Sequence, residues 1–139
     1  MAITSAVCNS FKQEVLGAIH DLDTDTIKIA LYTSSASLDA TTTAYTTSNE
    51  IVASGYTAGG NTLSGAVISL DSGTAIVDFS DTTWSAATIT ARGALIYNSS
   101  KSNKAIAVID FGADKISTNG DFTVQFPVAA AATAILRIS

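Results

Sequence analysis

The sequence predicts a mainly β fold, a β-sandwich or jelly roll of roughly eight antiparallel strands with one N-terminal amphipathic α-helix. Two observations favour strands: 47% of the residues are hydrophobic and only 14% charged, and Ser, Thr and Asn supply most of the polar side chains. A third is that turn-forming residues separate short apolar runs. At 139 residues the chain has the usual size of one domain. We therefore expect a single domain over residues 1–139, with a helix at 5–20 and a β-domain at 26–138.

The predicted helix rests on the one stretch with a helical period. Apolar residues recur every three or four positions between Ser5 and His20, on a stripe formed by Val7, Phe11, Val15, Ala18 and Ile19. Thr4 or Ser5 is the expected N-cap, and the turn Asp21-Leu22-Asp23 ends the pattern. The stripe has two possible uses: it covers the sheet, or it docks on a neighbouring chain.

A central hairpin is predicted from two apolar runs, Ile89–Tyr97 and Ala105–Phe111. Both carry apolar residues on both faces, which is typical of interior strands. The polar residues 98–103 between them form the expected turn.

The remaining strands are predicted around glycines and polar turns. Residues 26–33 form a strand with one apolar face. Thr57–Asn61 (TAGGN) is a hairpin signal between a short strand after Ile51 and a longer one, and residues 63–70 and 74–79 pair around Asp71-Ser72-Gly73.

After the central hairpin, residues 112–121 are expected to form a polar loop with a turn at Asn119-Gly120. A strand follows at 122–126 and ends at Pro127. For residues 128–138 a closing strand is preferred over an Ala-rich helix.

The stretch Ser34–Glu50 has no sustained apolar period and is long for a connection inside a compact domain. We expect it to be ordered by a partner protein, because it has too few apolar residues to fold over its own core. Tyr45 could hold the loop to its own domain or to another surface. Tyr45, Asn49 and Glu50 are therefore candidate contact residues, and deleting residues 36–47 is expected to leave the fold intact.

Two further contact candidates lie in the predicted strands. Trp84 is either a core or lid residue or, with Tyr45, Tyr56 and Tyr97, a platform for a sugar or a base. Arg92 interrupts an apolar strand and must find a partner. We expect that partner to be Asp78 or Asp110, or a group on another subunit.

Little in the sequence points to catalysis or cofactors. The single histidine, His20, excludes a metal cage of several imidazoles, and we expect it to cap carbonyls at the helix end or to face solvent. Cys8 is expected to be a buried small hydrophobe. Asp21, Asp23 and Asp25 resemble the start of a calcium loop, but the glycine and glutamate that complete one are missing. We expect no enzyme activity, no cofactor and no metal; a hydrolase using His20 and a serine is the enzymatic alternative.

Charge and hydropathy limit the classes of partner. A net charge of -5 leaves no basic surface for nucleic acid. The N-terminal residues fit neither a signal peptide nor a membrane span. The mean hydropathy of +0.34 is high for a small free monomer and indicates subunit contacts, or else an Ala-rich buried core.

Several phrases of the chain resemble small virion structural proteins of tailed bacteriophages. These are ALYTS (30–34), ATTTAYTTSNE (40–50), GYTAGGNTL (55–63), TARGALIYNSS (90–100) and FTVQFP (122–127). The resemblance covers most of the chain beyond the N-terminal helix. It implies a non-enzymatic particle component and brings no catalytic residues.

Within that group, the resemblance implies first a capsid decoration (cement) protein, a β-sandwich that binds the head shell as a dimer or trimer. Its partners would be the major capsid protein or other virion proteins, and its location the virion, after synthesis in the host cytoplasm. A tail or neck component is the main alternative. A carbohydrate-binding β-sandwich is another.

Overall fold

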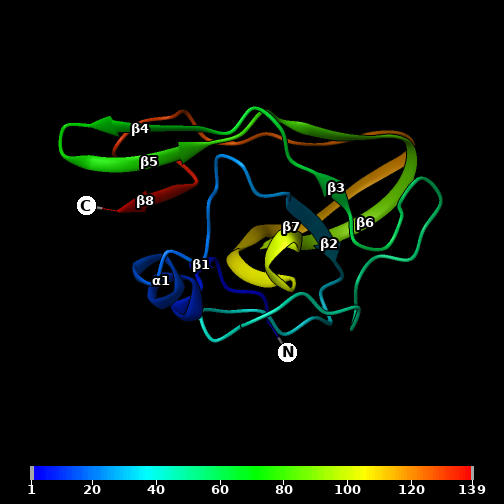
Figure 1. The fold of residues 1–139 in the computed structure, drawn as a ribbon. Helices are drawn as coiled ribbons and strands as arrows, with labels where there is room; N and C mark the ends of the chain where they lie inside the picture. The colour runs from blue at the N-terminus through cyan, green and yellow to red at the C-terminus, as the bar shows by residue number, and fades with distance from the viewer. Residues whose placement is uncertain (1, 139) are drawn as a thin grey trace.

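The computed structural model describes residues 2–138, which form a mainly β fold of two antiparallel sheets with one α-helix near the N-terminus. The larger sheet has five strands in the order β1-β7-β6-β2-β3, and the smaller has three in the order β4-β5-β8. Figure 1 shows the small sheet at one side of the molecule, with the helix below β8 and the long β6–β7 hairpin curving through the other side. The predicted fold class is confirmed, and the arrangement is consistent with a β-sandwich.

The long hairpin of β6 (Thr82–Asn98) and β7 (Lys104–Val124) is the centre of the larger sheet. Its two strands are joined by the short 3-10 helix η1 (Ser99–Lys101). Strand β2 (Ile27–Tyr32) pairs with the buried end of β6, from Gly93 to Asn98. Residues on both faces of this region are buried, as the apolar runs predicted.

The prediction of a polar loop at residues 112–121 is wrong, because β7 continues through them to Val124. Its register with β6 shifts at several points, and Asn119 has a positive φ of 44° within the strand instead of forming a turn. Such bulges bend and twist a ribbon. Both faces of this part of the hairpin carry exposed polar residues, so it lacks the apolar alternation of a half-buried strand.

The N-terminal helix α1 spans Asn9–Leu16 and is shorter than the predicted 5–20. Ala6–Val7 form strand β1, which pairs with Val108 and Ala107 of β7. Cys8 is extended (φ -65°, ψ 137°) and ends the strand before the helix begins. Pairing with the edge of β7 therefore overrides the helical period at these residues. Phe11 is buried as expected, whereas Ile19 lies beyond the helix and is partly exposed.

The glycine turn at 57–61 exists, but it does not close the predicted hairpin. No strand is assigned to residues 51–60, and β3 (Asn61–Thr62) pairs with Ile29 and Lys28 of β2. Gly60 has a positive φ of 76°, and a Cβ atom there would overlap the carbonyl group of Ile29. The turn thus places β3 beside β2, and only glycine at position 60 permits so close an approach of the two backbones.

The small sheet contains β4 (Val67–Asp71), β5 (Thr74–Asp78) and β8 (Leu136–Ile138). Strands β4 and β5 pair around Ser72 and Gly73, as predicted. Both turn residues have positive φ (51° and 88°), as a type I′ turn requires. The closing strand is confirmed for residues 136–138, while a bend at residues 129–130 and a turn at 131–133 precede it.

The core lies mainly under the larger sheet and extends to Leu136 of the small sheet. Its centre is the meeting of β2, β6 and β7, where Ile29, Leu31, Leu95, Ile96 and Ile106 are fully buried. Cys8 is buried there too, as predicted, and burial raises the pKa of its thiol to about 11.

Candidate protein-contact site

The predicted contact residues Tyr45 and Glu50 are joined to each other inside the molecule. The Glu50 carboxylate accepts hydrogen bonds from the hydroxyl groups of Tyr45 and Tyr56, each at 2.6 Å, and from the backbone N–H of Gly59 at 2.8 Å. Tyr97 stacks on Tyr45, with ring centroids 4.7 Å apart, and donates to the carbonyl group of Gly59 at 2.6 Å. We call these five residues, Tyr45, Glu50, Tyr56, Gly59 and Tyr97, the Glu50 cluster.

The Glu50 cluster lies in surroundings of low dielectric constant, which raise the pKa values of its tyrosine hydroxyl groups. Burial, together with the nearby Glu50 carboxylate, raises the pKa of Tyr97 to about 12. The same causes raise the pKa of Tyr56 and Tyr45 further. Tyr56 also accepts a hydrogen bond from the backbone N–H of Leu31 at 3.0 Å. One hydroxyl group therefore connects the loop carboxylate to strand β2.

The expectation that the loop 34–50 cannot fold over its own core is wrong. Ala36 and Leu38 are buried, and Leu38 makes a β-bridge with Ile3. The backbone N–H of Tyr45 bonds to the carbonyl group of Asn103. Because these contacts belong to the core and to the hairpin end, removing residues 36–47 would expose apolar groups. The structure therefore contradicts the expectation that deleting residues 36–47 leaves the fold intact. Of the two roles considered for Tyr45, the structure shows attachment to its own domain.

The other contact candidates differ in accessibility. Asn49 is exposed, has a positive φ of 61°, and donates to the carbonyl group of Ser35 at 3.3 Å. Arg92 is half-buried and pairs with Asp110 at 2.9 Å, as predicted. Glu50 and Trp84 are buried, so neither side chain can meet a partner at the surface of this fold.

Trp84 is a core residue, which confirms the first of its two predicted roles. Its ring lies near Tyr56 and Phe122, with centroids 5.9 Å and 6.1 Å away. Tyr56 and Tyr97 are buried with it. A sugar platform requires exposed ring faces, so the residues proposed for carbohydrate binding do not form one.

His20 lies in a buried polar network and not in solvent at a helix end. Its Nε2 is 2.9 Å from Oε1 of Glu14, and its Nδ1 is 3.1 Å from the amide nitrogen of Asn98. The same amide nitrogen donates to Asp25 at 2.8 Å. Because an amide nitrogen only donates, Nδ1 accepts and the Nε2 proton is directed at Glu14. Both ring nitrogens are thus engaged by groups other than a serine or cysteine.

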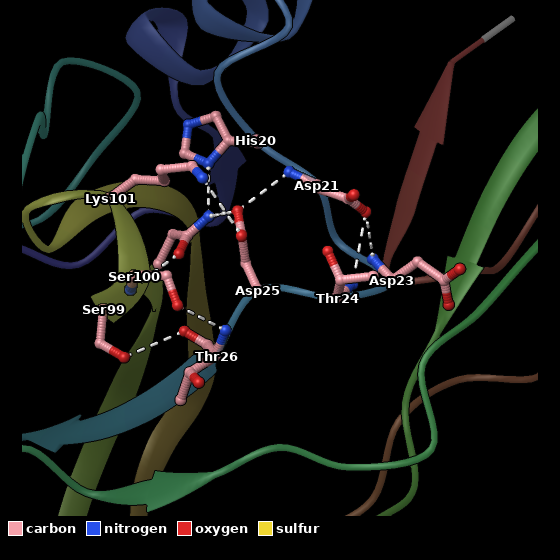
Figure 2. Close-up of polar contacts among 10 residues, drawn as sticks. His20, Asp21, Asp23, Thr24, Asp25, Thr26, Ser99, Ser100 and Lys101 are labelled. Atoms are coloured by element: carbon pink, nitrogen blue, oxygen red, sulfur yellow. Dashed lines mark hydrogen bonds and ion pairs between the residues drawn. The ribbon is translucent and has the colours of Figure 1, made fainter.

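The three alternating aspartates make local turns. Asp21 accepts hydrogen bonds from the backbone N–H groups of Asp23 and Thr24, while Asp25 accepts one from the backbone N–H of Asp21 (Figure 2). Asp25 also pairs with Lys101 at 3.3 Å. The hydrogen bond from Asn98, with these other donors, lowers the pKa of Asp25. Within residues 2–138, no group of three or more His, Cys, Asp and Glu side chains is placed to hold a metal ion.

A surface that the sequence analysis missed lies on the small sheet. The strand register places one row of residues, Ile68, Val77 and Leu136, beside a second row, Leu70, Ala75 and Ile138. Since side chains alternate between faces along a strand, all six lie on the same face. We call this the apolar face. It contains no polar side chain.

The chain after Pro127 covers part of the opposite face of the small sheet. Arg137 donates to the carbonyl groups of Ala131 and Ala132, and Asp71 accepts from the backbone N–H of Ala131. Ile76 is buried on this side. On this face the chain after Pro127 covers Ile76, while Val67 and Ser69 at the β4 edge stay exposed. On the apolar face Leu136 is buried, and Ile68, Leu70 and Ile138 are exposed.

The apolar face borders a groove of about 710 Å³, whose opposite wall is the helix α1. Phe11, Val15 and Leu16 line the helix side, and Ile68, Leu136 and Ile138 line the sheet side. Leu16 at 90%, Leu70 at 73%, Ile138 at 58% and Ile68 at 52% are exposed at the groove or on the face beside it. This groove and face are the strongest candidate contact surface.

Comparison of the chain with family models, curated proteins and solved structures found no match. In the described part of the chain, no helix has both the length and the apolar character needed to cross a membrane.

Proposed function

We propose that this chain is a non-enzymatic structural protein of a bacteriophage virion, a capsid decoration protein that binds the head shell. The observation that carries the proposal is the apolar face together with its groove. Contiguous apolar surface on a small protein marks an interaction site. The phrases that resemble virion structural proteins supply the class of partner.

The apolar face, not the loop 34–50, is the proposed contact with the shell. Most other large exposed apolar side chains, such as Val52 and Ile116, lie apart from it. Leu16, Ile68, Leu70 and Ile138 instead gather over α1 and the small sheet. The partner that fits is an apolar ridge of the major capsid protein, because the groove is lined mostly by aliphatic groups.

The size of this surface explains why attachment to a symmetric shell suits it. Burying a Leu or Ile side chain fully contributes about 1.5–3 kcal/mol. Scaled by their exposed fractions, the four side chains contribute about 4–8 kcal/mol per copy. Association costs about 4–15 kcal/mol. One contact is therefore marginal, and copies that are linked to one another gain from binding at several neighbouring sites.

The test is co-sedimentation of the purified chain with heads that lack it, assembled from the major capsid protein of the same genome. Wild type is expected to bind saturably. Leu16→Lys is expected to weaken binding, because it places a charge at the groove. Val52→Lys is the matched control: Val52 is 99% exposed and does not line the groove, so this variant should bind like wild type.

Two outcomes would contradict the proposal. The first is wild type that fails to bind heads. The second is equal binding by Leu16→Lys and wild type, which would remove the groove from the interface. Binding to purified tails and not to heads would favour the tail or neck alternative.

A further inference from the structure

The free edges of the two sheets differ in how well they are protected against pairing with a strand of another chain. The outer edge of β7 bridges to Ala44 at Lys104 and pairs with β1 at Ala107 and Val108, and no described strand pairs with it beyond these residues. It carries Asp114, Lys115 and Asp121, and positive-φ residues at Gly112 and Asn119 interrupt its regularity. Charges and bulges of this kind prevent edge-to-edge association. The free edges of β1 and β3 belong to strands of only two residues each.

Strand β4 has none of these protective features. It is five residues long, VISLD, with exposed apolar side chains and no lysine, arginine or proline. Its single charge, Asp71, lies at its end and bonds to Ala131. At the other edge of the small sheet, β8 has three residues with Arg137 at its centre. Among the edges of the described chain, β4 alone is long, apolar and uncharged along its middle.

The hairpin register shows which backbone groups of β4 are free. Asp71 pairs with Thr74 across a two-residue turn, and such a pair is hydrogen-bonded in a type I′ hairpin. Bonded and non-bonded pairs then alternate, so Val67, Ser69 and Asp71 direct their N–H and C=O groups to β5. The N–H and C=O groups of Ile68 and Leu70 point away from the sheet.

We propose that β4 pairs antiparallel with β4 of a second copy of this chain, about a two-fold axis at Ser69. In this register Ile68 lies opposite Leu70 of the second copy, and Leu70 opposite its Ile68. These are the residues whose backbone groups are free, so each pair exchanges two hydrogen bonds. The two small sheets become one six-stranded sheet, and their apolar faces join on the same side.

Charge supports a second copy as the occupant. In the register centred on Ser69, each Asp71 lies opposite Val67 of the other copy, so the two carboxylates are at opposite ends of the paired strands. No like charges meet, and a strand edge with two-fold symmetry is complementary to itself. The strand pairing involves five residues per copy, whereas a standard interface has roughly 20–30 per side. The expected state is therefore a concentration-dependent equilibrium of monomer and dimer.

The proposal concerns the purified chain and does not depend on the virion role, so it can fail while shell binding succeeds, or the reverse. The test is disulfide trapping with single cysteine variants. Ser69 would be a non-hydrogen-bonded pair with itself, with Cα atoms about 4.5 Å apart, a separation that a disulfide spans. Ser69→Cys should therefore give covalent dimers under mild oxidation.

Val67→Cys is the matched control, on the same strand and the same face. In the proposed dimer its two copies are separated by four residues along the strand, about 13 Å, which a disulfide cannot span. Ser69→Cys should yield several-fold more covalent dimer than Val67→Cys. Cys8 is present in both variants and is buried, so it does not bias the comparison.

Analytical ultracentrifugation of the unmodified chain supplies the second measurement. Wild type should dimerise with rising concentration. Ser69→Lys should raise the dimer dissociation constant by more than about tenfold, because like charges meet at the two-fold axis. Ser85→Lys, at an exposed position of β6 in the larger sheet, should leave it unchanged. Equal trapping of both cysteine variants, or a wild type that stays monomeric at every concentration, would overturn the proposal.

Discussion

The hydroxyl group of Tyr56 has two partners, and removing it measures what the Glu50 cluster contributes to the fold. It donates to Glu50 at 2.6 Å and accepts from the buried N–H of Leu31 at 3.0 Å. A hydrogen bond to a charged group contributes about 1.5–3 kcal/mol, and leaving a buried N–H unpaired costs about 1–3 kcal/mol. Tyr56→Phe, which keeps the ring packing, should therefore lower the free energy of unfolding by about 3–5 kcal/mol.

Two matched variants rank the effect within the same cluster. The Tyr45 hydroxyl donates only to Glu50 and belongs to a half-buried side chain, so Tyr45→Phe should cost about 1–2 kcal/mol. The Tyr97 hydroxyl donates to a neutral carbonyl group, so Tyr97→Phe should cost about 1 kcal/mol. Each kcal/mol corresponds to roughly 3–4 °C in Tm for a chain of this length.

The assay is thermal unfolding at neutral pH followed by circular dichroism. Tyr56→Phe should lower the Tm by roughly 10–20 °C, Tyr45→Phe by less, and Tyr97→Phe by least. If all three variants melted like wild type, or if Tyr97→Phe were the most destabilised, the Glu50 cluster would not be what holds the loop 34–50 to the sheet.

Further variants and conditions test other parts of the fold. Phe11→Ala should lower the free energy of unfolding by about 3–5 kcal/mol because the ring is buried; an unchanged urea midpoint would show that α1 contributes no packing. Asn98→Asp should cost about 3 kcal/mol, since it places a second carboxylate against Asp25; Asn98→Ser, uncharged, should be milder, and the reverse order would refute the repulsion. The folded state raises the pKa of Tyr97 to about 12 and of Cys8 to about 11, from 10.0 and 9.0. The protonated forms of Tyr97 and Cys8 therefore stabilise the folded state fully below about pH 9, and this stabilisation is lost as the pH rises toward 12. A Tm that stays constant from pH 8 to 11.5 would contradict this prediction.

The central hairpin could be predicted because the residues that indicate it lie within its own two strands. Residues 89–97 and 105–111 carry apolar side chains on both faces, and only a strand buried on both sides needs that pattern. The extension of β7 through residues 112–121 could not be predicted in the same way. That ribbon is held by backbone pairing with β6, and its exposed polar side chains resemble those of a loop.

The contact residues were harder to predict than the fold because burial depends on distant partners. Glu50 is polar and lies in a stretch without periodicity, yet Tyr56 and Gly59 turn back to enclose it. Nothing in the sequence near Glu50 marks those donors. The apolar face had a signal in the alternation of Ile68 with Leu70 and of Ala75 with Val77. That alternation predicts a half-buried hairpin, but not that Ile68 and Leu70 on its apolar side stay exposed.

The helix boundary shows how two signals compete at one place. Val7 fits the apolar stripe of a helix, and it also fits a strand. A free edge of β7 accepts the backbone of Ala6 and Val7, so strand pairing prevails there. The helix starts only after extended Cys8.

The most direct test of the virion role is to count copies of this chain by mass spectrometry in purified heads and tails of the phage that encodes it. The account predicts that the chain is found in the head fraction, at a fixed ratio to the major capsid protein. Its absence from both fractions would contradict the virion role, and its presence only in tails would contradict capsid decoration.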